Sequence, residues 1–168
     1  MAKQSAGLLM YRRAGDAVEM FLVHPGGPYW AKKDKGAWTI PKGEYGEGED
    51  PLAAARREFE EETGFEPTGV MREIGAVKQN SGKVVWAWAF EGDFDPTRLE
   101  SNTCEIEWPP RSGKRITIPE VDRGEWFVME QAREYIREEQ REFLAALRDM
   151  IRGENAGPAE SPGTKRHF

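Results

Sequence analysis

Apolar runs in the first quarter of the chain predict strands that precede any helix. The runs at residues 6–11 and 18–23 are separated by a turn at 14–16, which predicts a β-hairpin. A loop rich in glycine, proline and lysine follows at 24–36, and residues 38–40 are predicted as a short strand. The chain therefore begins with a sheet rather than with a helical bundle.

The first helix is bounded by sequence signals at both ends. Asp50 can cap the free backbone N–H groups, and Pro51 at the first helical position has no N–H to lose. Gly64 can adopt the left-handed conformation that ends a helix, and Phe65 after it supplies the usual hydrophobic contact. These signals predict a helix over residues 51–63.

The rest of the chain predicts more strands and then helices. Five further strands are expected, at residues 70–78, 83–90, 104–108, 115–118 and 124–128. Residues 84–88 are apolar on both faces, which is typical of a central strand. Between 130 and 151 apolar residues recur at helical spacing, with a break near Glu138 and Glu139. We expect two helices that pack on the sheet.

Length and composition fit one soluble domain with a short tail. The chain has 168 residues, of which 38% are hydrophobic and 32% charged, values typical of globular proteins. Glycine, proline, serine and charged residues dominate from Gly153 onward. We predict a single domain over residues 1–152 and a flexible C-terminal tail over 153–168.

Charge and cysteine content narrow the expected partners and location. The 24 Lys and Arg against 30 Asp and Glu give a net charge of -6, so general nucleic-acid binding is not expected. Cys104 is the single cysteine and cannot form an internal disulfide, which suits a reducing cytoplasm. The longest apolar run near the start, residues 6–11, is too short for a signal-peptide core or a membrane span. We expect a cytoplasmic protein without a membrane partner.

The predicted helix at 51–63 carries a stripe of carboxylates. At helical spacing, Glu58, Glu61 and Glu62 fall within roughly 100° of one another, and such crowding raises proton affinity and destabilises the helix. A divalent cation such as Mg²⁺ resolves this repulsion, because hard cations prefer carboxylate oxygens. Arg57 lies four residues before Glu61 and could hold that carboxylate, with Glu49 as a second partner.

The same residues form a specific motif. Five residues separate Gly43 from Glu49, and seven separate Glu49 from the run Arg57-Glu58-Phe59-x-Glu61-Glu62-x-Gly64-Phe65. This arrangement matches every fixed position of the Nudix box, and the lead-in Trp38-x-x-Pro41-Lys42-Gly43 is also similar to the family. The chain thus resembles the Nudix hydrolases of the MutT-like type.

The resemblance implies a fold and a reaction. The fold would be an α/β/α sandwich with a mixed central sheet, and the reaction hydrolysis of a nucleoside diphosphate linked to another moiety. Water must attack a phosphorus surrounded by negative oxygens, so bound metal would neutralise the polyphosphate and activate the water, with a carboxylate taking its proton. Mg²⁺ is the implied cofactor, with Mn²⁺ as a substitute, and a small nucleotide or polyphosphate is the implied substrate.

The resemblance also implies roles for individual residues. Glu58, Glu61 and Glu62 would bind metal or act as the base, with that division left open. Arg57 would orient a carboxylate. A backbone carbonyl at Lys42 or Gly43 would be an additional metal ligand, and Glu120 is the candidate for a contributing glutamate outside the helix.

Cations and aromatic residues near the box are candidate substrate contacts. Lys42, directly before the box, is placed to reach a phosphate, and Trp38, Tyr29 and Trp30 are candidate substrate-binding aromatics. Arg111 and Lys114 form a second basic patch, which is either a phosphate contact or an ordinary loop.

The substrate prediction rests on the lead-in to the box. Residues 38–43 resemble the branch that splits dinucleoside polyphosphates, although 80–82 replace a tyrosine that this branch often carries after the box. Nucleoside triphosphates, ADP-ribose-like compounds and diphosphoinositol polyphosphates are alternative substrates. The acidic net charge disfavours RNA ends, although the local lysine and arginine patches could bind them. A non-catalytic Nudix-fold binding module is the rival class.

Overall fold

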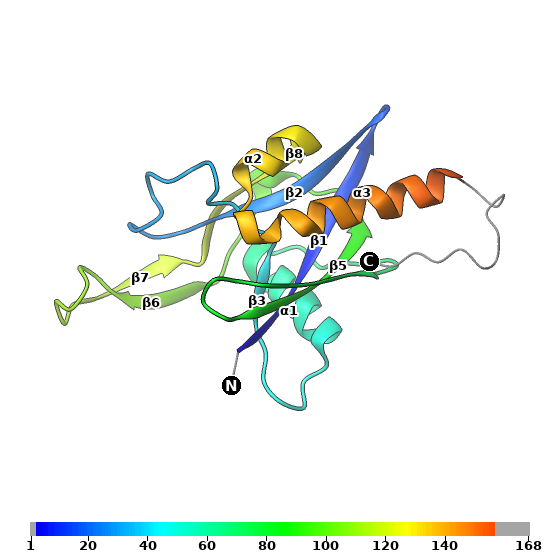
Figure 1. The fold of residues 1–168 in the computed structure, drawn as a ribbon. Helices are drawn as coiled ribbons and strands as arrows, with labels where there is room; N and C mark the ends of the chain where they lie inside the picture. Colours follow the sequence, from blue (N-terminus) through cyan, green and yellow to red (C-terminus); the bar gives the residue numbers. More distant parts are fainter. Residues whose placement is uncertain (1–2, 157–168) are drawn as a thin grey trace.

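A mixed six-stranded sheet organises residues 3–156, the part of the chain that this computed structural model describes (Figure 1). Its strands are β1 (Gln4–Ala14), β2 (Ala17–Pro25), β3 (Lys42–Glu44), β4 (Arg72–Lys78), β5 (Val84–Glu91) and β8 (Val121–Val128). The order is β4-β5-β1-β2-β8, and the short β3 pairs with β1. The pair β1–β5 is parallel and the other pairs are antiparallel, so the predicted mixed sheet is confirmed.

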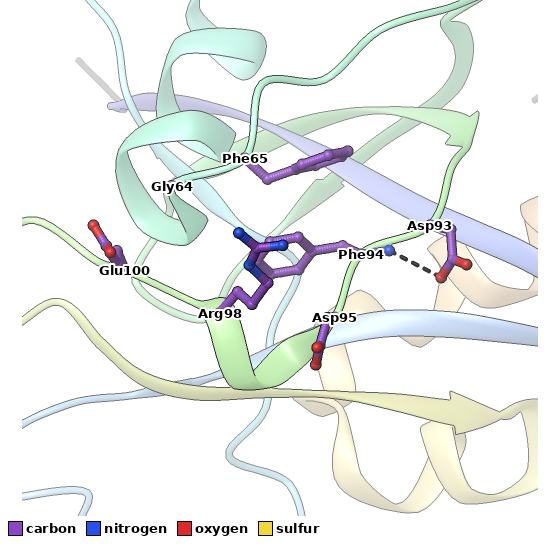
Figure 2. A pocket seen from close by; sticks show the side chains of 7 residues that line it. All are labelled: Gly64, Phe65, Asp93, Phe94, Asp95, Arg98 and Glu100. Carbon is purple, nitrogen blue, oxygen red and sulfur yellow. Dashed lines mark hydrogen bonds between the residues drawn. The ribbon is translucent and has the colours of Figure 1, made fainter.

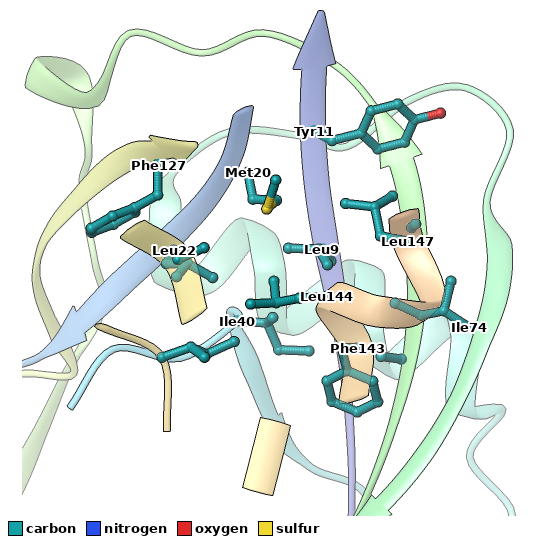
Figure 3. Packing of buried hydrophobic residues seen from close by; sticks show 14 of the residues in the cluster. Leu9, Tyr11, Met20, Leu22, Ile40, Ile74, Phe127, Phe143, Leu144 and Leu147 are labelled. Carbon is teal, nitrogen blue, oxygen red and sulfur yellow. The ribbon is translucent and has the colours of Figure 1, made fainter. Parts of the chain in front are cut away.

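Alternating residues of β1 and β2 bury the two faces of the sheet against different helices. On one face Leu8 and Phe21 pack with residues of α1 (Pro51–Thr63). On the other, Leu9 and Leu22 pack with α2 (Met129–Tyr135) and α3 (Arg141–Ala156), as Figure 3 shows for Phe143, Leu144 and Leu147. The result is the predicted α/β/α sandwich.

Both predicted ends of α1 are confirmed. The Asp50 side chain accepts a hydrogen bond from the Ala53 backbone N–H at 2.9 Å, which satisfies one of the free donors of the first turn. Gly64 has φ 77° and its N–H donates to the Glu60 carbonyl oxygen at 2.7 Å. These caps fix where the glutamates of the box fall on the helix.

The predicted strand at 38–40 is wrong. Its backbone groups bond alternately to two elements: Thr39 exchanges hydrogen bonds with Val23 of β2, and the Trp38 N–H donates to the Tyr135 carbonyl oxygen at 2.9 Å. A segment divided in this way forms isolated bridges and no ladder. The strand near this position is instead β3.

The helical C-terminal part divides as predicted, and α3 is longer than expected. The 3₁₀ turn η2 (Glu138–Gln140) separates α2 from α3, and α3 continues to Ala156. Glu154, expected in the tail, forms ion pairs with Arg13 and Arg72 that tie the end of α3 to β1 and β4. The remainder of the predicted tail, 157–168, lies outside the described residues, and the boundary at 152 stays a prediction.

A separate hairpin and a short turn complete the fold. In the described part of the chain, the strands β6 (Thr103–Glu107) and β7 (Arg115–Pro119) pair only with each other, and they project from the sandwich (Figure 1). The 3₁₀ turn η1 (Pro96–Arg98) precedes them. Within residues 3–156, no helix combines the length and the apolar character needed to cross a membrane.

Candidate active site

Two carboxylates of α1 and one from the connection between β7 and β8 converge. Glu58 and Glu62 lie one helical turn apart on α1, and Glu120 lies between β7 and β8. One oxygen from each of the three side chains lies within 4.8 Å of the others. The structure therefore brings together two of the predicted helix glutamates and the predicted glutamate outside the helix.

Burial makes the negative charge of this cluster unfavourable. Glu58 is 8% exposed and Glu62 is 7% exposed. Burial raises the pKa of Glu62 well above its ordinary value, and Glu120 and Glu58 raise it further against the opposing charge of Lys42. Burial is also the main cause that raises the pKa of Glu58 and of Glu120, with Glu61 adding to both. Three carboxylates held this close repel one another when ionised, and a divalent cation bound to their oxygens would offset that repulsion.

Arg57 holds the outer side of the cluster. Its Nη1 donates to Glu58 Oε2 at 2.7 Å and its Nη2 to Glu49 Oε2 at 3.0 Å. Glu61 is half-buried and lies 3.4 Å from Nη1, so it stands beside the cluster rather than within it. The guanidinium thus contacts three glutamates of the box motif and fixes the rotamer of Glu58.

Glu120 is positioned through its backbone. The Gly26 N–H donates to the Glu120 carbonyl oxygen at 3.0 Å, and the Glu120 N–H donates to the Asn102 carbonyl oxygen at 3.0 Å. A Cβ on Gly26 would lie 2.1 Å from the Pro119 carbonyl oxygen, so only glycine permits this approach. The loop after β2 therefore sets the place of Glu120.

Gly43 provides the space that the Glu58 carboxylate fills, because a Cβ there would lie 2.0 Å from Glu58 Oε1. We expect Gly43→Ala to displace this carboxylate and lower turnover by about 10²-fold, with little change in melting temperature because a flexible side chain yields. Steady-state rates and thermal melts check this. Gly46→Ala is the matched control, since nothing lies within 4 Å of its Cβ. A Gly43→Ala protein with wild-type turnover would contradict the placement of Glu58.

A pocket of about 180 Å³ adjoins the carboxylates. It is lined by Pro25, Trp30, Thr39, Lys42, Glu62, Glu120, Val121 and Arg137. Of the predicted substrate contacts, Lys42 and Trp30 are here. The Lys42 N–H donates to Glu62 Oε1 at 3.3 Å, and burial lowers the pKa of the Lys42 ammonium. Sequence reasoning missed Arg137, which carries no motif and enters the pocket from the connection between α2 and α3.

The other predicted substrate residues lie elsewhere. Tyr29 is 56% exposed and meets Trp30 edge to face, with ring centroids 5.0 Å apart. Trp38 is 1% exposed, and its Nε1–H donates to Asp34 at 2.8 Å, so it has no surface for a substrate in this structure. Arg111 and Lys114 lie at the turn of the β6–β7 hairpin, at its opposite end from Glu120. The hairpin length keeps this basic patch away from the carboxylates.

A larger pocket, of about 550 Å³, lies at the C-terminal end of α1 (Figure 2). It is lined by Gly64, Phe65, Asp93, Phe94, Asp95, Arg98 and Glu100, and shares no residue with the pocket beside the carboxylates. Asp93 pairs with Arg12, and Asp95 caps η1. Two of its three acidic side chains, Asp93 and Asp95, thus have structural partners.

Comparison with known proteins identifies the family. The family model for the NUDIX domain matches residues 1–147, so the chain belongs to the Nudix family. It is 32% identical over 122 residues to the rat bis(5'-nucleosyl)-tetraphosphatase (asymmetrical), which covers 64% of this chain and 79% of that protein. It is 30% identical over 134 residues to the RNA pyrophosphohydrolase of Rhizobium meliloti, covering 68% and 75%. The chain is a hydrolase acting on phosphoanhydride bonds.

Solved structures share the fold at low identity. An Ap4A hydrolase of C. elegans in a binary complex has a TM-score of 0.62 at 20% identity, covering 89% of this chain and 98% of that one. The NUDIX domain of Shewanella oneidensis NrtR, complexed with ADP ribose, has a TM-score of 0.64 at 11% identity, covering 90% and 89%. Both likenesses bear on the fold alone.

Proposed function

We propose that this chain is a divalent-cation-dependent pyrophosphohydrolase that cleaves dinucleoside polyphosphates. The observation that carries the proposal is the convergence of Glu58, Glu62 and Glu120 within 4.8 Å beside a pocket that also contains Lys42 and Trp30. Carboxylate oxygens would hold the cation, and Lys42 and Trp30 would meet the phosphates and a base.

Each residue of the cluster has a task in this reaction. When bound, Mg²⁺ or Mn²⁺ supplies charge neutralisation and lowers the pKa of a coordinated water. Glu58, Glu62 and Glu120 would hold the cation, with a backbone carbonyl of Lys42 or Gly43. Glu61 is retained as a metal-binding or proton-accepting residue, since it influences the pKa of both Glu58 and Glu120. Arg57 would keep Glu58 in place.

The bond changes are those of a hydrolysis. The oxygen of water bonds to phosphorus, the phosphoanhydride P–O bond breaks, and its electron pair leaves with the departing phosphate. A carboxylate of the box accepts the water proton. The departing phosphate therefore carries one more ionised oxygen than it did in the intact substrate. Nearby cations stabilise this charge.

The choice of dinucleoside polyphosphates rests on two supports. Residues 38–43 resemble that branch of the family, and the rat tetraphosphatase is 32% identical. The identity to an RNA pyrophosphohydrolase makes a phosphoanhydride bond of RNA the second candidate for cleavage. A binding module without catalysis has no chemical need for the complete carboxylate set, which favours the enzyme.

A substrate panel tests the proposal. The protein is incubated with Ap4A, ATP, ADP-ribose and 5'-triphosphate RNA, with Mg²⁺, Mn²⁺ or excess chelator, and products are separated by chromatography. We expect cleavage only with a divalent cation and the highest kcat/KM for Ap4A. Full turnover in chelator would contradict the metal proposal. A higher kcat/KM for ATP or RNA would replace Ap4A as the proposed substrate and leave the proposed hydrolase activity intact. Tight binding without any cleavage would favour the binding module.

A further inference from the structure

The backbone of Arg137 is fixed against the lead-in to the Nudix box. Its N–H donates to the Trp38 carbonyl oxygen at 2.8 Å, and the preceding Ile136 is fully buried and bridges to Trp38. The residue follows α2 and precedes η2, so these two elements and the segment of Trp38 determine the position of its backbone. The point from which the Arg137 side chain enters the pocket is therefore fixed.

The guanidinium of Arg137 has donors available for a ligand. Its side chain is 32% exposed, and Glu139 is its sole acidic neighbour within 4.0 Å, with 3.7 Å between Nε and Oε1, among residues 3–156. In that part of the chain the guanidinium donates no hydrogen bond. Glu139 does not line the pocket, and Glu62 and Glu120, which do, are not paired with Arg137. The guanidinium of Arg137 therefore forms no ion pair with the carboxylate cluster.

An aromatic ring limits the orientation of this guanidinium. The Cζ of Arg137 lies 5.6 Å from the centroid of the Trp30 ring, within the range of a cation–π contact. Lys42 lies in the same pocket. Two cations and an aromatic face thus border this pocket. The other charged residues that line it are Glu62 and Glu120.

We infer that Arg137 is a specificity-determining residue that binds a phosphoryl group of the substrate beyond the bond that is cleaved. This inference rests on the proposed function, because it takes Glu58, Glu62 and Glu120 as the place of cleavage. The planar guanidinium matches two phosphate oxygens at once, which an ammonium does not. It favours substrates with three or more linked phosphates over simple diphosphates.

Binding of inorganic polyphosphates tests the inference without requiring turnover. Pyrophosphate and tripolyphosphate are titrated into the protein by calorimetry at fixed free Mg²⁺, and the phosphates are checked by chromatography afterwards. In the wild type, tripolyphosphate is expected to bind more tightly than pyrophosphate. Arg137→Gln is expected to weaken tripolyphosphate binding about tenfold and pyrophosphate binding less than about twofold, as for one lost charged hydrogen-bond donor.

Two further variants separate geometry from charge and from folding. Arg137→Lys keeps the charge and loses the two-point contact, so it should recover only part of the difference. Arg133→Gln, an exposed arginine of α2 outside the pocket, removes the same charge and should bind both probes as the wild type does. Thermal melts establish that each variant is folded.

The outcomes are distinct from those of the substrate panel. Equal weakening of both probes in Arg137→Gln, or the same weakening in Arg133→Gln, would show a general charge effect and overturn the inference. So would a wild type that does not distinguish the two probes. Absence of cleavage on every substrate of the panel would remove the proposed function, whereas the length dependence of binding would still be measured.

Discussion

Replacing Glu62 by glutamine is expected to lower turnover by about 10² to 10⁴-fold, the range typical of losing a carboxylate that acts on the proton or the metal. Glutamine has the same size, and its amide oxygen can still accept the hydrogen bond that Glu62 Oε1 receives from the Lys42 N–H at 3.3 Å. The change therefore removes charge and leaves packing in place. Steady-state kinetics at saturating Mg²⁺ measure the effect.

The same variant makes a prediction about stability and pH. Burial raises the pKa of Glu62, so the folded protein binds its proton more tightly than the unfolded chain does. The resulting stabilisation is fully present below the ordinary value of 4.5 and is lost as the pH rises through the folded pKa. In chelator, the melting temperature of the wild type should therefore fall with rising pH more steeply than that of Glu62→Gln.

A control and a decisive outcome accompany these measurements. Glu60→Gln changes an exposed glutamate on the same helix and should leave both turnover and the pH dependence of melting unchanged. Mg²⁺ should raise the melting temperature of the wild type more than that of Glu62→Gln, because a ligand that binds only the folded state stabilises it. Glu62→Gln that unfolds far below the wild type at every pH would make Glu62 a structural residue.

Local signals explain why the helix of the site could be predicted. Its start and end depend on Asp50, Pro51 and Gly64, which act within one turn of the chain, and the carboxylate stripe follows from helical spacing alone. The place of Glu120 depends on contacts across the fold with Gly26 and Asn102. Composition and periodicity contain no such information, and only the resemblance to the family made Glu120 a candidate.

The substrate side of the site shows where sequence reasoning ends. As cations that follow the box, Arg111 and Lys114 are candidate phosphate contacts in the sequence, but the structure places them at the turn of the β6–β7 hairpin. Arg137 lies in a helix connection without a motif, and it reaches the pocket because α2 and its following turn pack against residues 38–40. Cation positions in space depend on this packing rather than on distance along the chain.

Trp38→Ala is expected to destabilise the protein by about 3–5 kcal/mol, as for a large buried aromatic side chain. Trp38 is 1% exposed and lies edge to face with Phe127, with centroids 5.0 Å apart, and with His24 at 5.3 Å. Trp38→Phe keeps an aromatic ring there and loses the hydrogen bond to the exposed Asp34. Its free energy of unfolding should therefore fall less than that of Trp38→Ala, and it should retain most of kcat/KM. Denaturant unfolding and Michaelis kinetics compare the two variants.

A Trp38→Ala protein with wild-type stability and a raised KM would restore the substrate-binding role that the lead-in to the box suggested. Loss of stability in Trp38→Ala with near-normal KM in Trp38→Phe would instead show that the aromatic lead-in acts by anchoring the segment that carries Lys42 to the C-terminal helices.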